Sequence, residues 1–469
     1  MMNQPLLPTI ATIIHTIYRR KVILRLLFSG IVLFLATQIY LSTTTNTTAG
    51  ARYRKSWKLE IDDLIVQCYT IVFQNLIDSG FLTGDSKTLA VGTQFLELTG
   101  ALNESGVKYS KTTKRNDWLP YDNHTFDVEF CTHTSLDYSL NPSGFSSELS
   151  RTLKPDGYLI IHTESKDSYS LNSLLDLFDS FKLIRSREID IRHWSIEGIH
   201  EIVLKKQNKI LRRRRMIAGS CSVPAYKKSL IQDSEPLVFK EPLNPCISIK
   251  NNFENVKNMR YLPLMADISF KTQYVYIDVG AKSYGSSIGS WFKKLYPKQE
   301  KPFKIFAIEA DKQFHEEYKS KKKITLLPYE PWVRNESLFF EINRVSNGPN
   351  EERGRGMGRV QSAQTSSSYM GDINKIQGFD FADWMKNSFG EKDFVVVKMD
   401  VDGTEFDLIK KMIENGAICL IDEMFLECHY DRKQRCSDGE RSSRYQNGYE
   451  ECMKLYSSLR EKGVLVHQW

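Results

Sequence analysis

The chain alternates short apolar runs with segments in which apolar residues recur every three or four positions. The first pattern predicts buried strands, and the second predicts helices that bury one face. Residues 88–92, 126–133 and 274–280 are clear strand runs, and residues 94–106 and 404–417 show the helical pattern. Strands that alternate with helices in this way predict an α/β fold with a mostly parallel sheet.

Two such α/β segments are expected, one over residues 57–206 and one over residues 260–469. Between them, residues 207–259 open with a basic run and then lose periodicity, which is typical of a solvated linker. Within the second segment, residues 346–378 are rich in glycine, serine and charge. Because such a stretch has little to bury, we expect it to be mobile when no ligand is bound.

The N-terminus carries a different pattern. Residues 22–42 are strongly apolar, carry no charge from Leu26 onward, and follow a basic cluster that includes Arg19 and Arg20. This pattern predicts a cytosolic tail (residues 1–21), a transmembrane signal anchor (22–42) and a short stalk (43–56). A cleaved signal peptide is disfavoured by the roughly 20 residues that precede the apolar run.

The expected topology is therefore single-pass type II, with the body in the lumen of the Golgi or the endoplasmic reticulum. Four acceptor sequons follow the anchor, at Asn46, Asn103, Asn123 and Asn335, as expected of a glycoprotein. Eight cysteines permit disulfides in that compartment. The net charge of +7 is modest and spread along the chain, so no nucleic-acid partner is expected.

The segment YVYIDVGAKSYGSSIGSWF (residues 274–292) reads as a strand, a glycine-containing turn and a helix. A parallel sheet binds ligands beyond the carboxyl ends of its strands, where Asp278, Gly280 and Glu309 are expected. A carboxylate such as Glu309 accepts hydrogen bonds from two ribose hydroxyls. The pattern alone leaves NAD, S-adenosylmethionine (SAM) and a purely structural turn open.

The ordered set IDVGAKSYGSS, FAIEAD, VVVKMDVDGTEFDLIKKM and MFLECHY resembles the FkbM-like SAM methyltransferases. The resemblance implies SAM as the cofactor, with Asp278, Gly280 and Ala281 in the cofactor loop and Glu309 as the ribose carboxylate. Two positions depart from the family pattern: Lys282 replaces an asparagine, and Tyr284 stands where a second glycine is expected. Gly285 follows one place later. Tyr284 is expected either to pack on the cofactor, because an aromatic face attracts a cation, or to block the pocket.

The same resemblance places Asp400, Asp402 and Glu405 in an acidic loop, and Glu427 and His429 in the last motif. Methyl transfer is an in-line displacement that needs an aligned acceptor and, for a hydroxyl, a nearby base. These five residues are the candidate catalytic set, with His429 the best base by its intrinsic pKa. No metal is predicted, although carboxylates of this kind suit Mg²⁺.

The first α/β segment also resembles class I SAM methyltransferases, through WLPYDNHTFDVEF and ELSRTLKPDGYLII. Its cofactor end departs from that pattern: LAVGTQF has one glycine and no acid, and VKYSKTTK is basic where a ribose carboxylate belongs. We therefore expect a methyltransferase-shaped domain that does not bind SAM and has a structural role.

Taken whole, the chain resembles plant membrane-anchored proteins of the SAM methyltransferase superfamily. The expected fold is two Rossmann-like, class I methyltransferase-type domains after an N-terminal transmembrane helix. The leading functional hypothesis is O-methyl transfer to a glycan or a secreted small molecule. The alternatives are a non-catalytic scaffold of two degenerate domains and a glycosyltransferase, although Asp400 and Asp402 do not lie in a sugar-nucleotide context.

Overall fold

The computed structural model describes residues 48–114, 118–189, 198–207, 223–241, 259–343, 357–361, 372–430 and 447–469. The expected anchor (22–42) and the basic run of the linker lie outside these ranges. Among the described helices, none combines the length and the apolarity that a membrane crossing requires. The described residues form two compact units: residues 48–82 with 96–106, and residues 83–95 with the described part of 107–469.

The first unit is built on helix α2 (Thr48–Asp78) and helix α3 (Phe95–Glu104). The two helices approach closely, because a Cβ on Gly100 of α3 would lie 3.3 Å from a methyl of Val66. Thr70 donates a hydrogen bond to Glu104 at 3.0 Å. Residues 48–56, which the sequence suggested as a stalk, are the first turns of α2.

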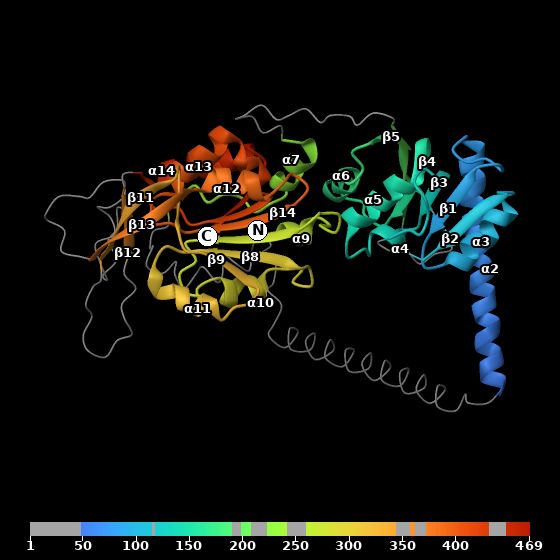
Figure 1. Ribbon diagram of the computed structural model, residues 1–469, viewed down its shortest axis with the longest axis horizontal. Helices are drawn as coiled ribbons and strands as arrows, with labels where there is room; N and C mark the ends of the chain where they lie inside the picture. Colours follow the sequence, from blue (N-terminus) through green and yellow to red (C-terminus); the bar gives the residue numbers. More distant parts are fainter. Residues whose placement is uncertain are drawn as a thin grey trace, which may run out of the picture. The chain divides into compact units, whose positions relative to one another are not determined.

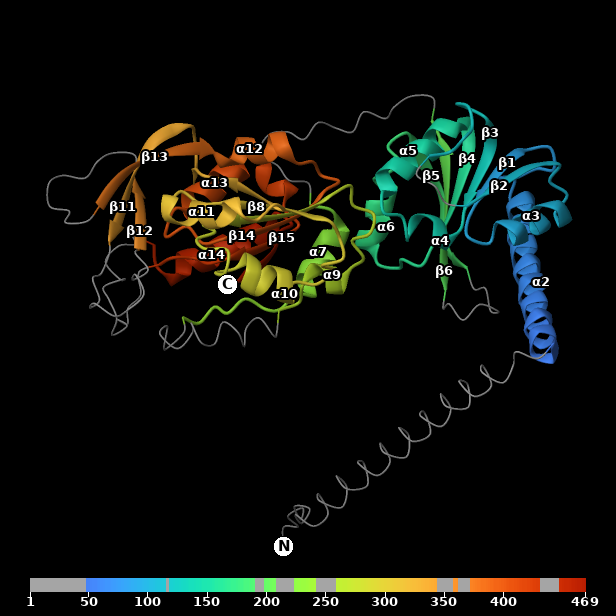
Figure 2. The same cartoon turned by 60° about the horizontal axis from the view of Figure 1, so that its bottom comes forward.

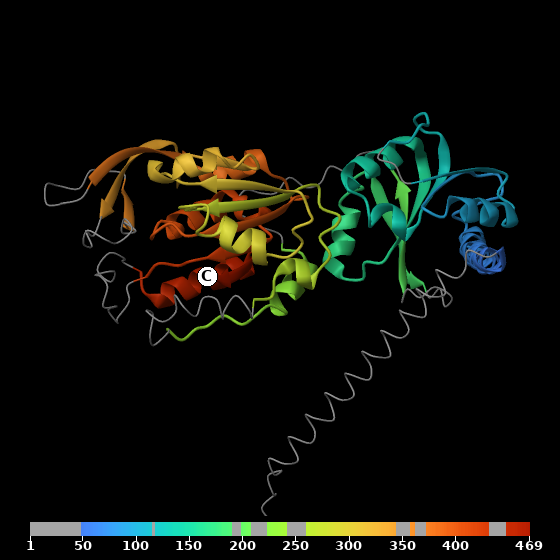
Figure 3. The same cartoon turned by 90° about the horizontal axis from the view of Figure 1, so that it is seen from below.

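The second unit contains both large sheets. The N-terminal sheet has the order β2-β1-β3-β4-β6-β5, and its strands lie side by side in Figure 3. Its strands are β1 (Lys87–Val91), β2 (Tyr109–Thr113), β3 (Phe126–Cys131), β4 (Leu153–Thr163), β5 (Phe181–Ile189) and β6 (Ile199–Lys206). Strands β1 to β4 are parallel, whereas β6 runs antiparallel to both β4 and β5. The expected mostly parallel sheet is confirmed.

Three short helices accompany this sheet: α4 (His133–Leu136), α5 (Pro142–Thr152) and α6 (Ser168–Leu175). Helix α5 begins where the side chain of Asn141 accepts a hydrogen bond from the N–H of Gly144 and Pro142 takes the first helical position. The buried core beneath the sheet includes Leu89, Phe126, Phe145 and Leu159.

The C-terminal sheet is parallel throughout, in the order β16-β15-β14-β7-β8-β9. Its strands are β7 (Tyr274–Val279), β8 (Phe303–Ile308), β9 (Ile324–Leu327), β14 (Phe394–Met399), β15 (Glu423–Leu426) and β16 (Leu465–Gln468). Helices α12 (Phe381–Ser388), α13 (Glu405–Asn415) and α14 (Tyr449–Glu461) pack on one face. The segments on the other face are α9 (Leu262–Met265), the π-helix η1 (Ile288–Phe292), α10 (Lys293–Leu295), the 3₁₀ turn η2 (Lys312–Phe314) and α11 (His315–Lys319). Figures 1 and 2 show this layered arrangement. A short helix α7 (Ala225–Gln232) precedes the domain, and the 3₁₀ turn η3 (Ala417–Leu420) follows α13.

The residues of β7 alternate between two hydrophobic cores. Val275, Ile277 and Val279 pack with α12, α13 and α14, whereas Tyr274 and Tyr276 pack on the opposite face with η1. All six residues of the strand are buried. A strand covered on both faces reads as a continuous apolar run, which is why the sequence identified it.

A separate four-stranded sheet, in the order β10-β13-β11-β12, is inserted between β9 and β14. Its strands are β10 (Glu330–Trp332), β11 (Glu336–Asn343), β12 (Met357–Gln361) and β13 (Asp372–Asp380). The stretch 346–378 is therefore partly regular: β12 and most of β13 fall within it, because both pair with β11. The expected mobility of residues 346–378 stays a prediction, and their other residues lie outside the described part of the chain.

Candidate active site

The backbone of the turn after β7 packs directly against the backbone of the loop after β14. Gly280 has φ of 77°, and a Cβ there would lie 2.0 Å from the carbonyl oxygen of Asp400. The N–H groups of Gly280 and Ala281 both donate to the carbonyl of Ile308 at 3.1 Å. Only glycine allows this approach without displacing the second loop. The first chain position beyond β7 is thereby fixed between β8 and β14.

Glu309 follows β8 and holds two loops with its carboxylate. Its oxygens accept hydrogen bonds from the N–H of Lys282 and from the N–H of Asp311, each at 2.7 Å. The residue is 7% exposed, and burial raises the pKa of Glu309 to about 7 against the opposing effect of the two donors. Since a carboxylate offers about four acceptor positions, two remain for ligand hydroxyls.

Asp278 is fully buried at the end of β7, where it accepts a hydrogen bond from Ser287. Burial raises the pKa of Asp278, and Lys398 opposes that shift. The hydroxyl of Tyr318, which interacts electrostatically with Asp278 and Glu309, is buried without a hydrogen-bond partner among the described residues. A glycine approach, two carboxylates and an orphaned hydroxyl fit the polyhydroxyl end of a nucleoside cofactor.

Tyr284 and Gly285 lie at the outer part of the turn. The Tyr284 ring stands against Gly289 of η1, with the ammonium groups of Lys321 and Lys293 at 4.3 and 5.5 Å from its centroid. Gly285 is exposed and has open space where a Cβ would be. The contacts of Tyr284 are with lysines and η1, so the ring's described neighbours do not include the acidic loop.

Asp400 lies at the centre of a charged cluster beyond β14. One of its oxygens, Oδ2, is 3.1 Å from the ammonium of Lys282 and 3.5 Å from that of Lys398. Lys398 also lies 3.6 Å from Asp278, although its side chain is only 4% exposed. Burial alone would raise the pKa of Asp400, but the two ammonium groups hold it well below its usual value. Lys398 was not among the predicted site residues, because it lies inside an apolar strand run.

His429 is surrounded by carboxylates. Its Nε2 lies 3.6 Å from Asp400, 3.4 Å from Asp402 and 4.0 Å from Glu427, and its Nδ1 lies 3.4 Å from Glu405. Burial would lower the pKa of His429, but these carboxylates, Glu405 foremost, raise it to about 9. The ring is therefore a cation at neutral pH. The expectation of a free base from the intrinsic pKa is wrong, because that argument ignored the ring's neighbours.

Glu405, at the start of α13, uses its carboxylate to hold backbone groups in place. Its carboxylate accepts hydrogen bonds from the N–H of Gly403 at 2.9 Å and from the N–H of His429 at 2.6 Å. It is fully buried, so it joins the acidic loop to the end of β15. Glu427 lies two positions before His429 in the sequence. Burial, together with Asp400, raises the pKa of Glu427.

The structure adds Glu330, on β10, which sequence reasoning missed. It is 8% exposed, and burial raises its pKa well above the ordinary value, with Glu309 and Asp402 adding to the shift. Ligand atoms of Asp400, Asp402 and His429 also lie within 4.8 Å of one another, as in a metal site. Lys282 and Lys398 already offset the negative charge of Asp400. That the site holds no metal stays a prediction.

All these groups meet at one point of the sheet topology. After β7 the chain adds β8 and β9 on one side, and later returns to add β14 on the other side. The crevice at such a reversal, beyond the carboxyl ends of the strands, is where open α/β sheets bind ligands. The structure thus brings together the predicted cofactor residues Asp278, Gly280 and Glu309 and the predicted catalytic cluster.

Comparison with known proteins gives two family matches. A methyltransferase domain family matches residues 93–161, and a domain of unknown function (DUF7870) matches residues 235–337 and 346–469. No curated protein matches the chain. The methyltransferase match begins at Thr93, after β1, so it covers the centre of the N-terminal sheet and not the strand that leads into the turn.

Among solved structures, a SAM-dependent methyltransferase from Methanosarcina mazei is 15% identical, with a TM-score of 0.22. That match covers 28% of this chain and 98% of the other. One from Aquifex aeolicus is 16% identical, with a TM-score of 0.22, and covers 28% of this chain and 89% of the other. At such low identities and scores these are similarities alone. Residues 93–161 are thus similar to a methyltransferase domain family, and this similarity supports SAM as the cofactor.

Proposed function

We propose that the C-terminal domain is an FkbM-like methyltransferase that transfers a methyl group to a hydroxyl of a glycan or a secreted small molecule. The observation that carries the proposal is the crevice between β7 and β14. Residues for donor binding (Asp278, Gly280, Glu309) and a charged cluster for the acceptor (around Asp400) meet there across a backbone contact.

The donor side is formed by the β7 turn and the end of β8. Glu309 keeps two acceptor positions for the ribose hydroxyls while its other two hold the turn in place. Gly280 allows the main chain to come close to the ligand. When bound here, SAM supplies an activated methyl group on a sulfonium.

The acceptor side has three cations and several carboxylates. His429, as an imidazolium, donates toward Asp400, Asp402 or Glu427, and its backbone N–H is held by Glu405. Glu427 has a side chain 32% exposed and a raised pKa, so it is better suited than Asp400 to accept a proton from an acceptor hydroxyl. We therefore assign the base to Glu427 and the orienting role to His429.

The test is calorimetry of the full-length protein with SAM, together with labelled-methyl transfer to glycans and small molecules from a secretory extract. Glu309→Ala removes charge-assisted hydrogen bonds worth roughly 1.5–3 kcal/mol each, so donor affinity should fall about ten- to a hundredfold. Glu427→Gln should reduce transfer and leave donor affinity nearly intact. Unchanged SAM affinity in a folded Glu309→Ala variant would contradict the donor assignment.

Two other outcomes favour the alternatives. A folded protein that binds no SAM favours the non-catalytic scaffold, and saturable binding of a sugar nucleotide favours a glycosyltransferase. Because the three hypotheses differ in which ligand binds the crevice, one set of titrations separates them.

We further propose that the domain lies in the lumen, held by the anchor expected at residues 22–42. The disulfide between Cys428 and Cys452 supports this placement, because such bonds persist in oxidising compartments. Asn103, Asn123 and Asn335 are exposed, as glycan acceptors must be. Glycosidase treatment should shift the gel mobility of protein made in a secretory host, and protease sensitivity in intact microsomes without any shift would reverse the orientation.

A further inference from the structure

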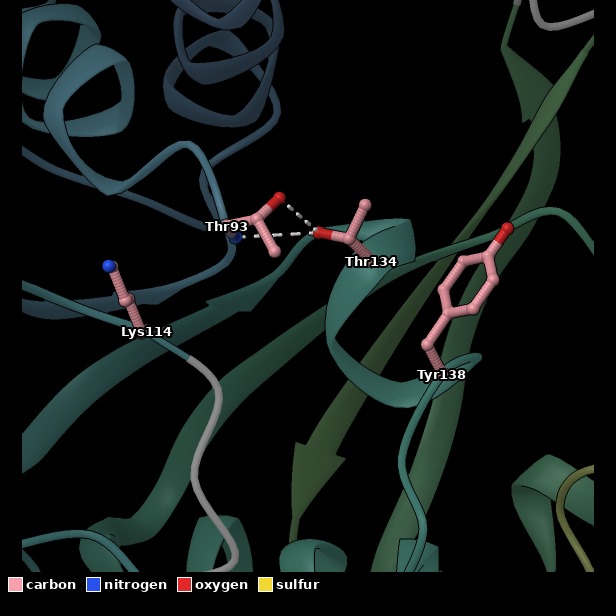
Figure 4. Close-up of a pocket in the computed structure, with 4 residues that line it drawn as sticks. All are labelled: Thr93, Lys114, Thr134 and Tyr138. Carbon is pink, nitrogen blue, oxygen red and sulfur yellow. Dashed lines mark hydrogen bonds between the residues drawn. The ribbon is translucent and has the colours of Figure 1, made fainter.

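A cavity of about 590 Å³ lies at the edge of the N-terminal sheet and has no part in the proposed function. The residues that line it, Thr93, Lys114, Thr134 and Tyr138, follow the carboxyl ends of β1, β2 and β3 (Figure 4). The chain adds β2 on one side of β1 and β3 on the other, so this is the reversal point of the N-terminal sheet. Both its size and its position are those of a small-molecule site.

Two hydroxyl groups stand together at this cavity, which is open to solvent: Thr93 is exposed and Thr134 is half-buried. Thr93 and Thr134 are linked through their Oγ1 atoms at 3.1 Å, and the N–H of Thr93 also points to Thr134 Oγ1 at 3.4 Å. Thr132 holds Thr134 from behind, with 2.8 Å between the two hydroxyl oxygens. Figure 4 shows this pair between Lys114 and Tyr138. Fixed hydroxyls of this kind are ready donors for an anionic oxygen.

The cation beside them is Lys114. Lys114 comes directly after β2, with its ammonium 5.3 Å from the ring centroid of Phe95. No carboxylate of the described residues pairs with it, whereas Lys108 at the other end of β2 forms an ion pair with Asp85 at 2.8 Å. A nucleoside site that binds a free ribose carries a carboxylate at the end of this strand, and a basic residue there accommodates a phosphate instead.

The charge of the cavity disfavours SAM, whose sulfonium and ammonium groups are both cationic. No carboxylate is among its described lining residues. Glu164 accepts a long hydrogen bond from the Tyr138 hydroxyl at 3.4 Å. Tyr138 lies at the opposite end of the cavity from Lys114. The cavity thus carries a lysine at the position where a site that binds a free ribose carries a carboxylate.

We propose that this cavity binds a phosphorylated small molecule of about nucleotide size, with the phosphate held by Lys114, Thr93 and Thr134. In this proposal the N-terminal domain binds a ligand of its own, in addition to the structural role expected from the sequence. The inference is independent of the donor site in the C-terminal domain.

The test is equilibrium dialysis of labelled ADP against the full-length protein in the presence of saturating SAM, with adenosine as the phosphate-free comparison. ADP should bind saturably and adenosine much more weakly. Lys114→Gln removes a charge-assisted contact, so ADP affinity should fall about ten- to a hundredfold. Thr134→Val, which keeps the shape and removes the hydroxyl, should weaken binding by a smaller factor.

Lys111→Gln is the matched control, because Lys111 is an exposed lysine of the same strand that does not line the cavity. It should leave ADP affinity unchanged. The proposal is overturned by absence of saturable ADP binding, by equal affinity for adenosine, or by equal effects of the Lys114 and Lys111 variants. Competition between SAM and ADP for this site would also overturn it. Failure of SAM to bind at all would leave it standing and would count against the proposed function alone.

Discussion

Lys398 gives the sharpest test of the electrostatics of the candidate active site. Its ammonium is buried between Asp278 at 3.6 Å and Asp400 at 3.5 Å, and its side chain is 4% exposed. Lys282 reaches the same oxygen of Asp400 at 3.1 Å, but its side chain is 44% exposed. Replacing each lysine by methionine keeps most of the unbranched, apolar side chain and removes the charge.

The two variants should differ several-fold in cost. Lys398→Met leaves two buried carboxylates without their shared cation, a change that typically lowers the free energy of unfolding by about 3–5 kcal/mol. Lys282→Met breaks a partly solvated pair, for which about 0.2–1 kcal/mol is typical. Adding Asp278→Asn to Lys398→Met removes one of the stranded charges, so the double variant should recover part of the lost stability.

The assay is urea unfolding at neutral pH, followed by tryptophan fluorescence because Trp291 is buried in the C-terminal core. Equal slopes for the variants would show that only stability has changed. The reasoning fails if Lys398→Met costs no more than Lys282→Met. It also fails if the double variant is less stable than Lys398→Met alone.

Three further outcomes are expected. His467 is buried between two glutamates, which raise its pKa to about 9 against the effect of burial. Its contribution to stability is full below about pH 6.5 and is lost as the pH rises toward 9. The urea midpoint should therefore fall between about pH 6.5 and 9 in the unaltered protein, and this dependence on pH should be weaker in His467→Gln. Gly280→Ala should cost at least about 1–3 kcal/mol in thermal unfolding, because it adds a Cβ at positive φ and 2.0 Å from the Asp400 carbonyl, while Gly285→Ala, with open space around it, should be nearly neutral. Cys452→Ser should lower stability by about 3 kcal/mol through loss of a bridge that spans 24 positions, and a reducing agent should then have little added effect at this bridge.

The sequence predicted the central strands well because each is buried on both faces and therefore forms an unbroken apolar run. Strands β7 and β14 are examples, and both are buried over their whole length. Helix α2 was not predicted from the sequence. Its buried residues nevertheless recur at helical spacing: Tyr69, Val72, Phe73 and Leu76. That pattern was the available signal.

The site was predicted in outline because acids at the ends of parallel strands meet at one edge. Its electrostatics were not, because a pKa depends on neighbours that are distant in sequence. His429 is the clearest case, since Asp400 and Glu405 lie on other elements. Glu330 was missed for the same reason: nothing in its local sequence indicates that it is buried near Glu309.

The order of strands in the C-terminal sheet also bears on how the domain folds. Strand β7 pairs with β8 about 30 residues later, but Tyr274 pairs with Phe394 about 120 residues later, so closing the second contact costs more chain entropy. Strands that are close in sequence tend to pair first. The half of the crevice that carries Asp278 and Glu309 can thus assemble early, whereas the half that carries Asp400 must wait for β14 to dock. Until then β7 is an open, apolar strand edge, and the nascent domain is most exposed to aggregation in that interval.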